Sequence, residues 1–287
     1  MDILISGLNN YVGRRCISNM ADEQIHVYAI TRNQKLLEKR LTEPMRATLA
    51  TVDLMRGGSS SALVIPNLQA AFYFTQVPTL NDPLNLNLEI LCLRNYIHLL
   101  ATYNCRRLIY VARLMDKSCL QPIKDLLHEF NVDFTIVLKN SVIGKGALIN
   151  KVFTSMSNHR LLFFPKFVSA IEFQPLGVLE FIKWLKAILF VEEFHGQTLE
   201  VGGAETIRFE KLYNLYEQEG VIAKRKLRPS IPKFLARFIY QYKMDISSTD
   251  FVEFRRVVQF DGAVANLWQQ HMPFTFSPIA QVLRADH

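Results

Sequence analysis

The sequence predicts an α/β protein built on a doubly wound parallel sheet, with a smaller α/β lobe at the C-terminal end. Short β-branched or aliphatic runs alternate with longer stretches of helical spacing. Most of these runs are apolar throughout, which is typical of strands that helices cover on both faces. The 287 residues, 49% of them hydrophobic and 21% charged, are enough to bury a sizeable core.

The first half of the chain holds six expected strands, at residues 2–6, 25–31, 47–53, 70–75, 106–112 and 132–139. The longest helical stretch between them is 83–105, where apolar residues recur at steps of three and four. Because crossovers between parallel strands are right-handed, helices fall on both faces of one sheet of about six or seven strands. We expect residues 1–140 to form this core domain.

The alternation of strand and helix segments becomes less regular after residue 140. The expected elements there are an amphipathic helix at 174–189, a strand ending in a glycine turn at 197–203, and a helix at 204–220. The last helix is placed by Thr206 near its start and Gly220 just past its end. Residues 246–287 give weak signals. We expect residues 141–287 to form a C-terminal lobe for a substrate or partner, partly interleaved with the core.

The formal net charge of +7 favours anionic partners such as nucleotide phosphates, nucleic acid or acidic lipid. A basic but otherwise ordinary surface is the plainer alternative. Residues 224–243 are basic and rich in aromatic residues, so they suit an acidic membrane surface or a protein partner, or pack on their own domain. Binding to nucleic acid is not expected, because no recognisable nucleic-acid-binding motif accompanies the positive charge.

The chain shows no run that predicts a transmembrane segment, since charges interrupt the most apolar stretch, 176–190. Its four cysteines have no CxxC spacing, and no metal site is predicted. With no signal peptide visible, we expect a reduced, cytoplasmic protein.

Residues 3–15 predict a strand, a glycine turn and the start of a helix; their sequence is ILISGLNNYVGRR. Gly7, Asn10 and Gly13 have the spacing of a dinucleotide loop, which places a diphosphate against helix amides. Asn10 replaces the middle glycine. Asparagine tolerates a positive φ, so we expect the turn to survive, with a side chain that either crowds a phosphate or donates to it. A tight turn without ligand is the alternative.

Arg32 follows the second strand, where NAD-specific proteins carry an acid for the ribose hydroxyls. Arginine there suits a 2′-phosphate or simply ends a solvated strand, and Arg14 and Arg15 add charge. Asp53 either faces an adenine amino group or starts a loop. We expect NADP(H), with NAD(H) as the alternative. The predicted cofactor contacts are Gly7, Asn9, Asn10, Tyr11, Val12, Gly13, Arg32, Asp53, Leu54 and Thr75.

Together these stretches resemble the extended and atypical branch of the short-chain dehydrogenase/reductase superfamily, above all its NmrA-like and epimerase-like members. GLNNYVGR is similar to the family's GATGYIGR, and RRLIYVA is similar to KRIVYLS. NVDFTIVLKNSVIGKG and GQTLEVGGAETIRFEKL also match family segments, in the family's order. The likeness covers residues 1 to about 220.

The resemblance implies a Rossmann sheet that binds NAD(P), a small substrate lobe and oxidoreductase chemistry. The family transfers hydride with a serine, a tyrosine and a lysine, but these positions fall on Ala112, Asp116 and Leu120. We therefore predict no catalytic residue. The implied roles are a redox sensor, regulator or accessory subunit. The alternatives are an NADPH-dependent oxidoreductase or epimerase with other residues, and a cofactor-free scaffold.

Overall fold

A computed structural model describes residues 1–57, 63–158, 171–224, 248–257, 260 and 262–286. The chain divides into two compact units. The first consists of residues 1–139, 181–201 and 267–272, and the second of residues 140–180, 202–266 and 273–287. The first unit therefore includes two segments from the second half of the chain.

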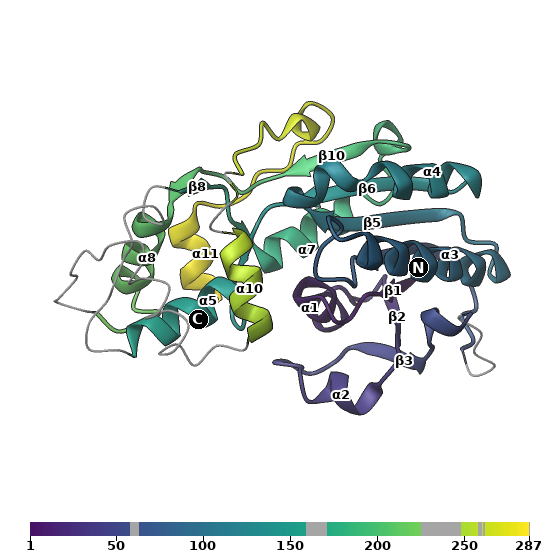
Figure 1. Ribbon diagram of the computed structural model, residues 1–287, viewed down its shortest axis with the longest axis horizontal. Coiled ribbons are helices and arrows are strands. Elements are labelled where there is room, and N and C mark those ends of the chain that lie inside the picture. The colour runs from purple at the N-terminus through teal and green to yellow at the C-terminus, as the bar shows by residue number, and fades with distance from the viewer. Residues whose placement is uncertain (58–62, 159–170, 225–247, 258–259, 261, 287) are drawn as a thin grey trace. The chain divides into compact units, whose positions relative to one another are not determined.

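The first unit is built on a seven-stranded sheet with the order β10-β6-β5-β4-β1-β2-β3 (Figure 1). All six neighbouring pairs run parallel. The strands are β1 (Asp2–Ser6), β2 (His26–Thr31), β3 (Ala47–Thr51), β4 (Leu68–Phe74), β5 (Arg107–Arg113), β6 (Asp133–Lys139) and β10 (Thr198–Val201). This order confirms the predicted doubly wound sheet, and every expected strand is present.

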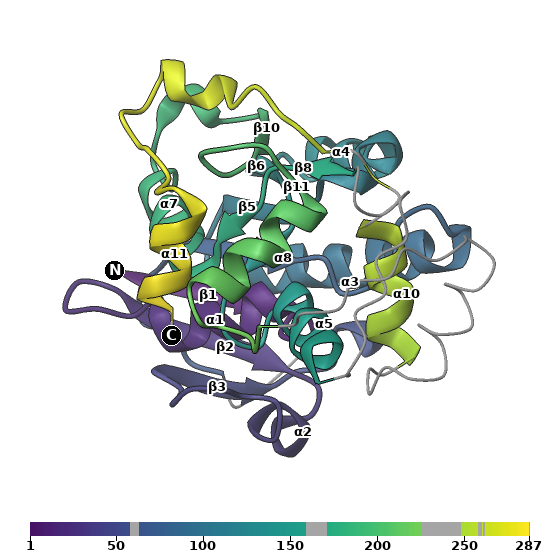
Figure 2. The same ribbon diagram turned by 90° about the vertical axis from the view of Figure 1, so that its left-hand side faces the viewer.

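Helices cover both faces of this sheet, because the right-handed crossovers from β1 to β2 and from β4 to β5 run in opposite directions along it. Figure 2 shows α1 and α7 on one face and α3 and α4 on the other. The helical elements are α1 (Tyr11–Asn19), α2 (Gln34–Glu38), η1 (Leu54–Arg56), α3 (Pro83–Thr102), η2 (Leu114–Cys119), α4 (Gln121–Glu129), α7 (Val178–Ala187), η3 (Glu192–Phe194) and η4 (Leu267–Gln270). The strands β1, β4 and β5 are buried almost throughout because they are covered from both sides.

The long helix α3 has strong local signals. The Asp82 carboxylate caps its start by accepting from the Leu84 and Asn85 amides, and Pro83 stands in its first turn. The Tyr96 hydroxyl, fully buried, donates to the Leu4 carbonyl at 2.9 Å. This bond fixes α3 against the middle of the sheet.

The second unit packs helices around an aromatic core. Its elements are β7 (Val142–Ile143), α5 (Leu148–Ser157), β8 (Glu172–Phe173), β9 (Leu176–Gly177), β11 (Ile207–Arg208), α8 (Phe209–Gln218), α10 (Ser248–Val257) and α11 (Ile279–Ala285). Two short two-stranded sheets, β7 with β9 and β8 with β11, complete it. The ring of Phe153 contacts Phe209, Tyr213 and Tyr216 edge-on, with centroids 4.9–5.0 Å apart.

Two expectations for the second half need correction or fall outside the described residues. The helix expected from Thr206 begins at Phe209 instead, because residues 207–208 pair with β8 as a strand. Gly220 ends it as expected, with a φ of +75°. The basic segment 224–243 lies outside the described residues beyond Lys224. Among the helices that the structure describes, none has the length and apolar content to cross a bilayer.

Candidate nucleotide site

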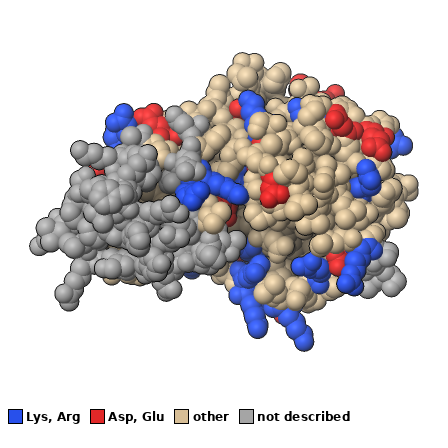
Figure 3. Space-filling view, viewed as in Figure 1, with Lys and Arg blue, Asp and Glu red and all other residues tan. Residues whose placement is uncertain are grey.

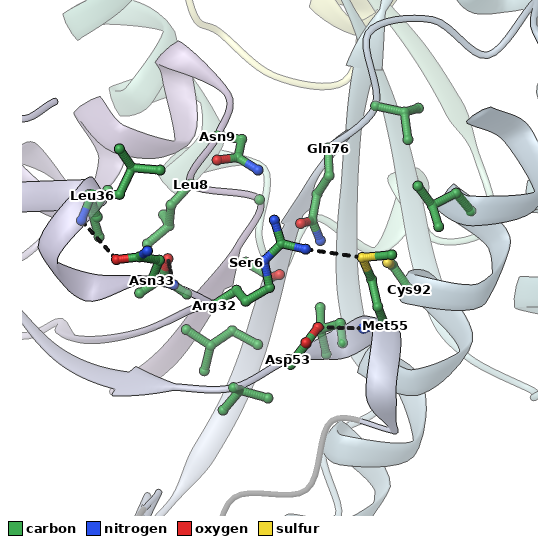
Figure 4. Close-up of a pocket in the computed structure, with 18 of the residues that line it drawn as sticks. Ser6, Leu8, Asn9, Arg32, Asn33, Leu36, Asp53, Met55, Gln76 and Cys92 are labelled. Carbon is green, nitrogen blue, oxygen red and sulfur yellow. Dashed lines mark hydrogen bonds between the residues drawn. The ribbon is translucent and has the colours of Figure 1, made fainter. Parts of the chain in front are cut away.

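A cavity of about 350 Å³ opens in the first unit at the carboxyl ends of β1, β2, β3 and β4 (Figure 4). In this sheet β2 and β3 lie on one side of β1, and β4, β5, β6 and β10 lie on the other. Open α/β sheets bind ligands at the carboxyl ends of the strands where the strand order reverses in this way. The cavity is lined by Ser6, Gly7, Leu8, Asn9, Ile30, Thr31, Arg32, Asn33, Leu36, Leu37, Arg40, Val52, Asp53, Leu54, Met55, Gln76, Val77, Leu88 and Cys92. Its volume is at the lower end of the range for small-molecule sites.

The glycine turn begins at Gly7, directly after β1. Its φ of +86° lies in the left-handed region. A Cβ at this position would overlap the carbonyl oxygen of Phe74 at the end of β4. Gly7 therefore lets the chain turn while it lies against the neighbouring strand.

Gly13 has a different role and lies in the first turn of α1. A Cβ here would come 2.9 Å from the Gly7 carbonyl oxygen and 3.2 Å from the Phe74 ring. The glycine thus allows α1 to lie close against the turn and the strand beneath it, which is the role of the last glycine in a dinucleotide loop.

The turn survives at Asn10, as expected, but without the positive φ that asparagine would tolerate. The φ and ψ of Asn10 are −71° and 140°, because it is the N-cap of α1. The side-chain oxygen accepts from the Val12 amide at 3.0 Å, and the side-chain nitrogen lies 3.5 Å from the Thr75 carbonyl oxygen. The side chain is thus engaged with the helix start and with the end of β4, and it is not part of the cavity wall.

Arg32 extends across the cavity toward Met55 (Figure 4). Its Nη1 lies 3.3 Å from the thioether sulfur, a weak acceptor. Arg40, after α2, also lines the cavity. Within the described ranges, neither guanidinium is in an ion pair with a carboxylate. In the part of the chain that the structure describes, these two positive groups of the cavity wall therefore have no carboxylate partner.

The carboxylate of Asp53 also lines the cavity, but it is engaged. Its Oδ1 accepts from the Met55 amide at 3.0 Å and caps η1, and its Oδ2 lies 3.8 Å from the Arg56 Nε. Both the ligand-facing and the loop-starting interpretations of Asp53 therefore agree with its position.

The surface around this cavity is basic. Figure 3 shows lysine and arginine side chains gathered over the region of α2 and β3. Six basic side chains in residues 32–56 are exposed, whereas the same segment has three acidic ones; the basic residues are Arg32, Lys35, Lys39, Arg40, Arg46 and Arg56. Such a surface raises the local concentration of anions at the cavity.

The structure places five of the predicted contacts in the cavity wall and five outside it. Those in the wall are Gly7, Asn9, Arg32, Asp53 and Leu54; those outside are Asn10, Tyr11, Val12, Gly13 and Thr75. Thr75 turns back into the sheet, where its hydroxyl donates to the Val111 carbonyl at 3.0 Å. Gln76 and Val77 line the cavity in its place. The sequence feature that could have indicated them is the end of the strand expected at 70–75.

Comparison with known proteins supports the fold. No family model matches the sequence, and no curated protein matches it either. Among solved structures, a nucleoside-diphosphate-sugar epimerase from Staphylococcus aureus aligns with a TM-score of 0.62 at 12% identity, covering 99% of this chain and all of the other. The fold is that of the sugar-nucleotide epimerases.

Reductases share the same Rossmann fold. The triphenylmethane reductase of Citrobacter sp., complexed with NADP(H), aligns with a TM-score of 0.65 at 10% identity over the whole of both chains. The yeast methylglyoxal/isovaleraldehyde reductase Gre2, complexed with NADPH, gives 0.65 at 13% identity, covering 100% of this chain and 96% of the other. At these identities the likeness establishes architecture.

In the first unit, called the Rossmann unit from here on, structural residues occupy the three positions on which the resemblance places the family's serine, tyrosine and lysine. Ala112 is buried in β5, and Leu120 is buried before α4. Asp116, 1% exposed, accepts from the Arg113 Nε at 2.7 Å and from the Leu80 amide at 3.2 Å. Arg113 also donates to the Pro78 carbonyl. The pair thus ties the end of β5 to the loop before α3.

A second buried carboxylate lies behind the cavity. Glu89 of α3 has no exposed surface and accepts from the Gln76 and Val77 amides at 3.1 and 3.3 Å, and from the Tyr110 hydroxyl at 3.2 Å. Burial raises the pKa of Glu89 to about 7 although these hydrogen bonds lower it. In the sequence, Glu89 is the one acidic residue of the helical stretch 83–105.

Proposed function

We propose that this chain belongs to the extended and atypical short-chain dehydrogenases/reductases and binds NADP(H) in the Rossmann-unit cavity, in preference to NAD(H). The two guanidinium groups of Arg32 and Arg40, which lie in one cavity wall and have no carboxylate partner among the described residues, carry this proposal. Guanidinium groups bind phosphate with paired, charge-assisted hydrogen bonds. Two guanidinium groups near the end of β2 that form no ion pair within the described ranges suit the 2′-phosphate that distinguishes NADP(H) from NAD(H).

The remaining cavity wall supports the same ligand. The turn from Gly7 to Asn9 supplies backbone at the end of β1, where a dinucleotide diphosphate lies in this fold. Leu36, Leu54 and Met55 supply an apolar wall for an adenine ring. The two reductases with this architecture are complexed with NADP(H) and with NADPH.

We further propose that the bound nucleotide is not turned over by the family's proton relay. Ala112 and Leu120 offer no titratable group, and the Asp116 carboxylate is engaged by Arg113. A nucleotide site without that relay suits a redox sensor, a regulator or an accessory subunit of a larger assembly. The protein would then respond to the NADP(H) pool rather than consume it.

Calorimetric titration of the full chain with NADPH and NADH tests the nucleotide preference. We expect NADPH to bind at least about tenfold more tightly, because the 2′-phosphate adds charge-assisted hydrogen bonds worth more than 1.4 kcal/mol. Arg32→Ala should remove that preference. The matched control is Arg46→Ala, since Arg46 is exposed in the same basic segment but is not in the cavity wall.

Equal affinity for the two nucleotides in the wild-type protein would contradict the assignment of the 2′-phosphate to Arg32 and Arg40. Loss of preference in Arg46→Ala would show that the general charge of the segment, rather than the cavity, selects the ligand. Steady oxidation of NADPH by a panel of carbonyls and quinones would contradict the non-catalytic role.

A further inference from the structure

Glu89 is placed to influence ligand binding without touching the ligand. Its Oε2 accepts from the backbone amides of Gln76 and Val77, the two residues that line the cavity from the β4 side. Its neighbours along α3, Leu88 and Cys92, line the cavity themselves. The carboxylate therefore forms the layer directly behind the cavity wall.

The surroundings of Glu89 leave its charge uncompensated. Tyr73 faces it from β4, Tyr110 and Arg113 from β5, and Cys92 from its own helix. Within the described part of the chain no cation lies within ion-pair distance of it, and the charge of Arg113 lowers its pKa less than its hydrogen bonds do. Desolvation dominates, so both protonation states are populated near neutral pH.

The hydrogen bonds around Glu89 accommodate both states. When the carboxylate is ionised, Tyr110 donates to its Oε1 at 3.2 Å. When it is protonated, the carboxyl group can donate to the Tyr110 oxygen, and Tyr110 can donate to the Thr75 hydroxyl 3.4 Å away. The Gln76 and Val77 amides keep their acceptor in both states, but the bonds are stronger to the charged form.

We infer that Glu89 is a positioning residue that couples nucleotide binding in this cavity to the uptake of a proton. The inference rests on the proposed function. A nucleotide anion beside Gln76 and Val77 disfavours a second negative charge behind the same backbone segment, so binding favours protonated Glu89. By linkage, nucleotide affinity then falls as the pH rises through the range in which Glu89 ionises.

The first experiment needs no ligand. The amide signals of Gln76 and Val77 in ¹H–¹⁵N spectra should shift with pH, with a midpoint near neutrality, in the wild-type protein. Glu89→Gln keeps an acceptor for both amides and a donor for Tyr110, but it removes the titration, so its amide signals should stay in place. Tyr110→Phe removes the hydrogen bond that lowers the pKa of Glu89, so the midpoint should move up.

The second experiment measures coupling. Calorimetric titrations with NADPH from pH 6 to 8, in buffers of different ionisation enthalpy, give the protons taken up on binding. The wild-type protein should take up a larger fraction of a proton than Glu89→Gln, and the ratio of its Kd to that of the variant should rise about three- to tenfold over this range. The ligand phosphate titrates equally in both proteins, so the ratio isolates Glu89.

The outcomes separate the two proposals. If NADPH binds both proteins with the same proton uptake, the coupling is wrong and the nucleotide site stands. If the Gln76 and Val77 signals do not titrate in the wild-type protein, Glu89 does not control this backbone segment and the inference is overturned. If neither NADPH nor NADH binds, the proposed function fails and the coupling fails with it.

Discussion

At the scale of single residues, the carbonyl group of Phe74 decides what can stand at position 7. The backbone of β4 lies where a Cβ of residue 7 would be, so only glycine fits. Gly196 also has a positive φ, +70°, but a Cβ added there would meet no atom within 4 Å. These two glycines of the Rossmann unit therefore separate the effect of backbone strain from the effect of a steric clash.

Gly7→Ala should lower the free energy of unfolding by at least about 3 kcal/mol, and Gly196→Ala by about 1 kcal/mol. The two tryptophans of the chain, Trp184 and Trp268, both lie in the Rossmann unit with ring centroids 5.3 Å apart. Urea denaturation followed by tryptophan fluorescence therefore reports on the unit concerned. Equal losses for the two variants would mean that strand β4 yields to the added methyl group.

Asn10 links helix capping to the ligand loop. Asn10→Asp keeps a capping oxygen for the Val12 amide, so the unfolding midpoint should change little. The new negative charge at the start of α1 should weaken NADPH binding about three- to tenfold by repelling the diphosphate. A thermal melt and a titration on the same sample check both statements. Unchanged affinity would place the diphosphate away from this helix start.

The residue-level predictions from sequence succeeded where the reason was steric and failed where it depended on a local capping choice. The glycines at positions 7 and 13 follow from the close approach of α1 and β4, which any such turn needs. The turn was expected to survive at Asn10 because asparagine tolerates a positive φ; the turn is present, but Asn10 has an extended backbone and caps the helix instead. Arg40 was missed because it follows a short helix, α2, that carries no clear periodic signal.

At the scale of elements, η2 contains Asp116, the position on which the resemblance places the family's tyrosine. The pair Arg113 and Asp116 holds this turn to the loop before α3. Removing Arg113 would leave a carboxylate that is 1% exposed without its cation. The tie between β5 and the loop therefore depends on both members of the pair.

Arg113→Ala should destabilise the Rossmann unit by about 3–5 kcal/mol, since a buried charge loses its partner. The double variant Arg113→Ala, Asp116→Ala should recover part of this loss, because no charge is left buried. Tryptophan fluorescence in urea measures both. A double variant as unstable as the sum of the two single variants would show that the pair does not act as a unit.

The sequence predicted the parallel strands of the seven-stranded sheet better than the elements of the second unit. Buried parallel strands are continuous apolar runs, so their limits differ from the expected ones by only a few residues. The helices α10 and α11 gave weak signals because they are short and depend on contacts made far along the chain. For example, the Ile279 amide at the start of α11 donates to the Glu205 carboxylate at 2.9 Å.

At the scale of the whole molecule, Glu89 makes stability depend on pH. Its pKa in the folded protein, about 7, is above the ordinary value of 4.5, so folding favours the protonated form. The stabilisation is complete below pH 4.5 and is lost as the pH rises toward 7. The loss amounts to at most about 3 kcal/mol.

The unfolding free energy of the wild-type protein should therefore fall relative to that of Glu89→Gln between pH 5 and 8. The difference between the two proteins cancels the contribution of other carboxylates. Urea titrations at several pH values measure it. A constant difference across this range would show that Glu89 keeps an ordinary pKa in the folded state.

The central claim is that the cavity at the ends of β1, β2, β3 and β4 holds an NADP(H) molecule by its adenosine 2′-phosphate. A crystal structure of the full chain with NADPH tests it most directly. We predict the 2′-phosphate within hydrogen-bond distance of the Arg32 and Arg40 guanidinium groups, with the diphosphate at the turn from Gly7 to Asn9. A nucleotide bound elsewhere, or a cavity left empty at saturating NADPH with Arg32 still on the Met55 sulfur, would contradict the claim.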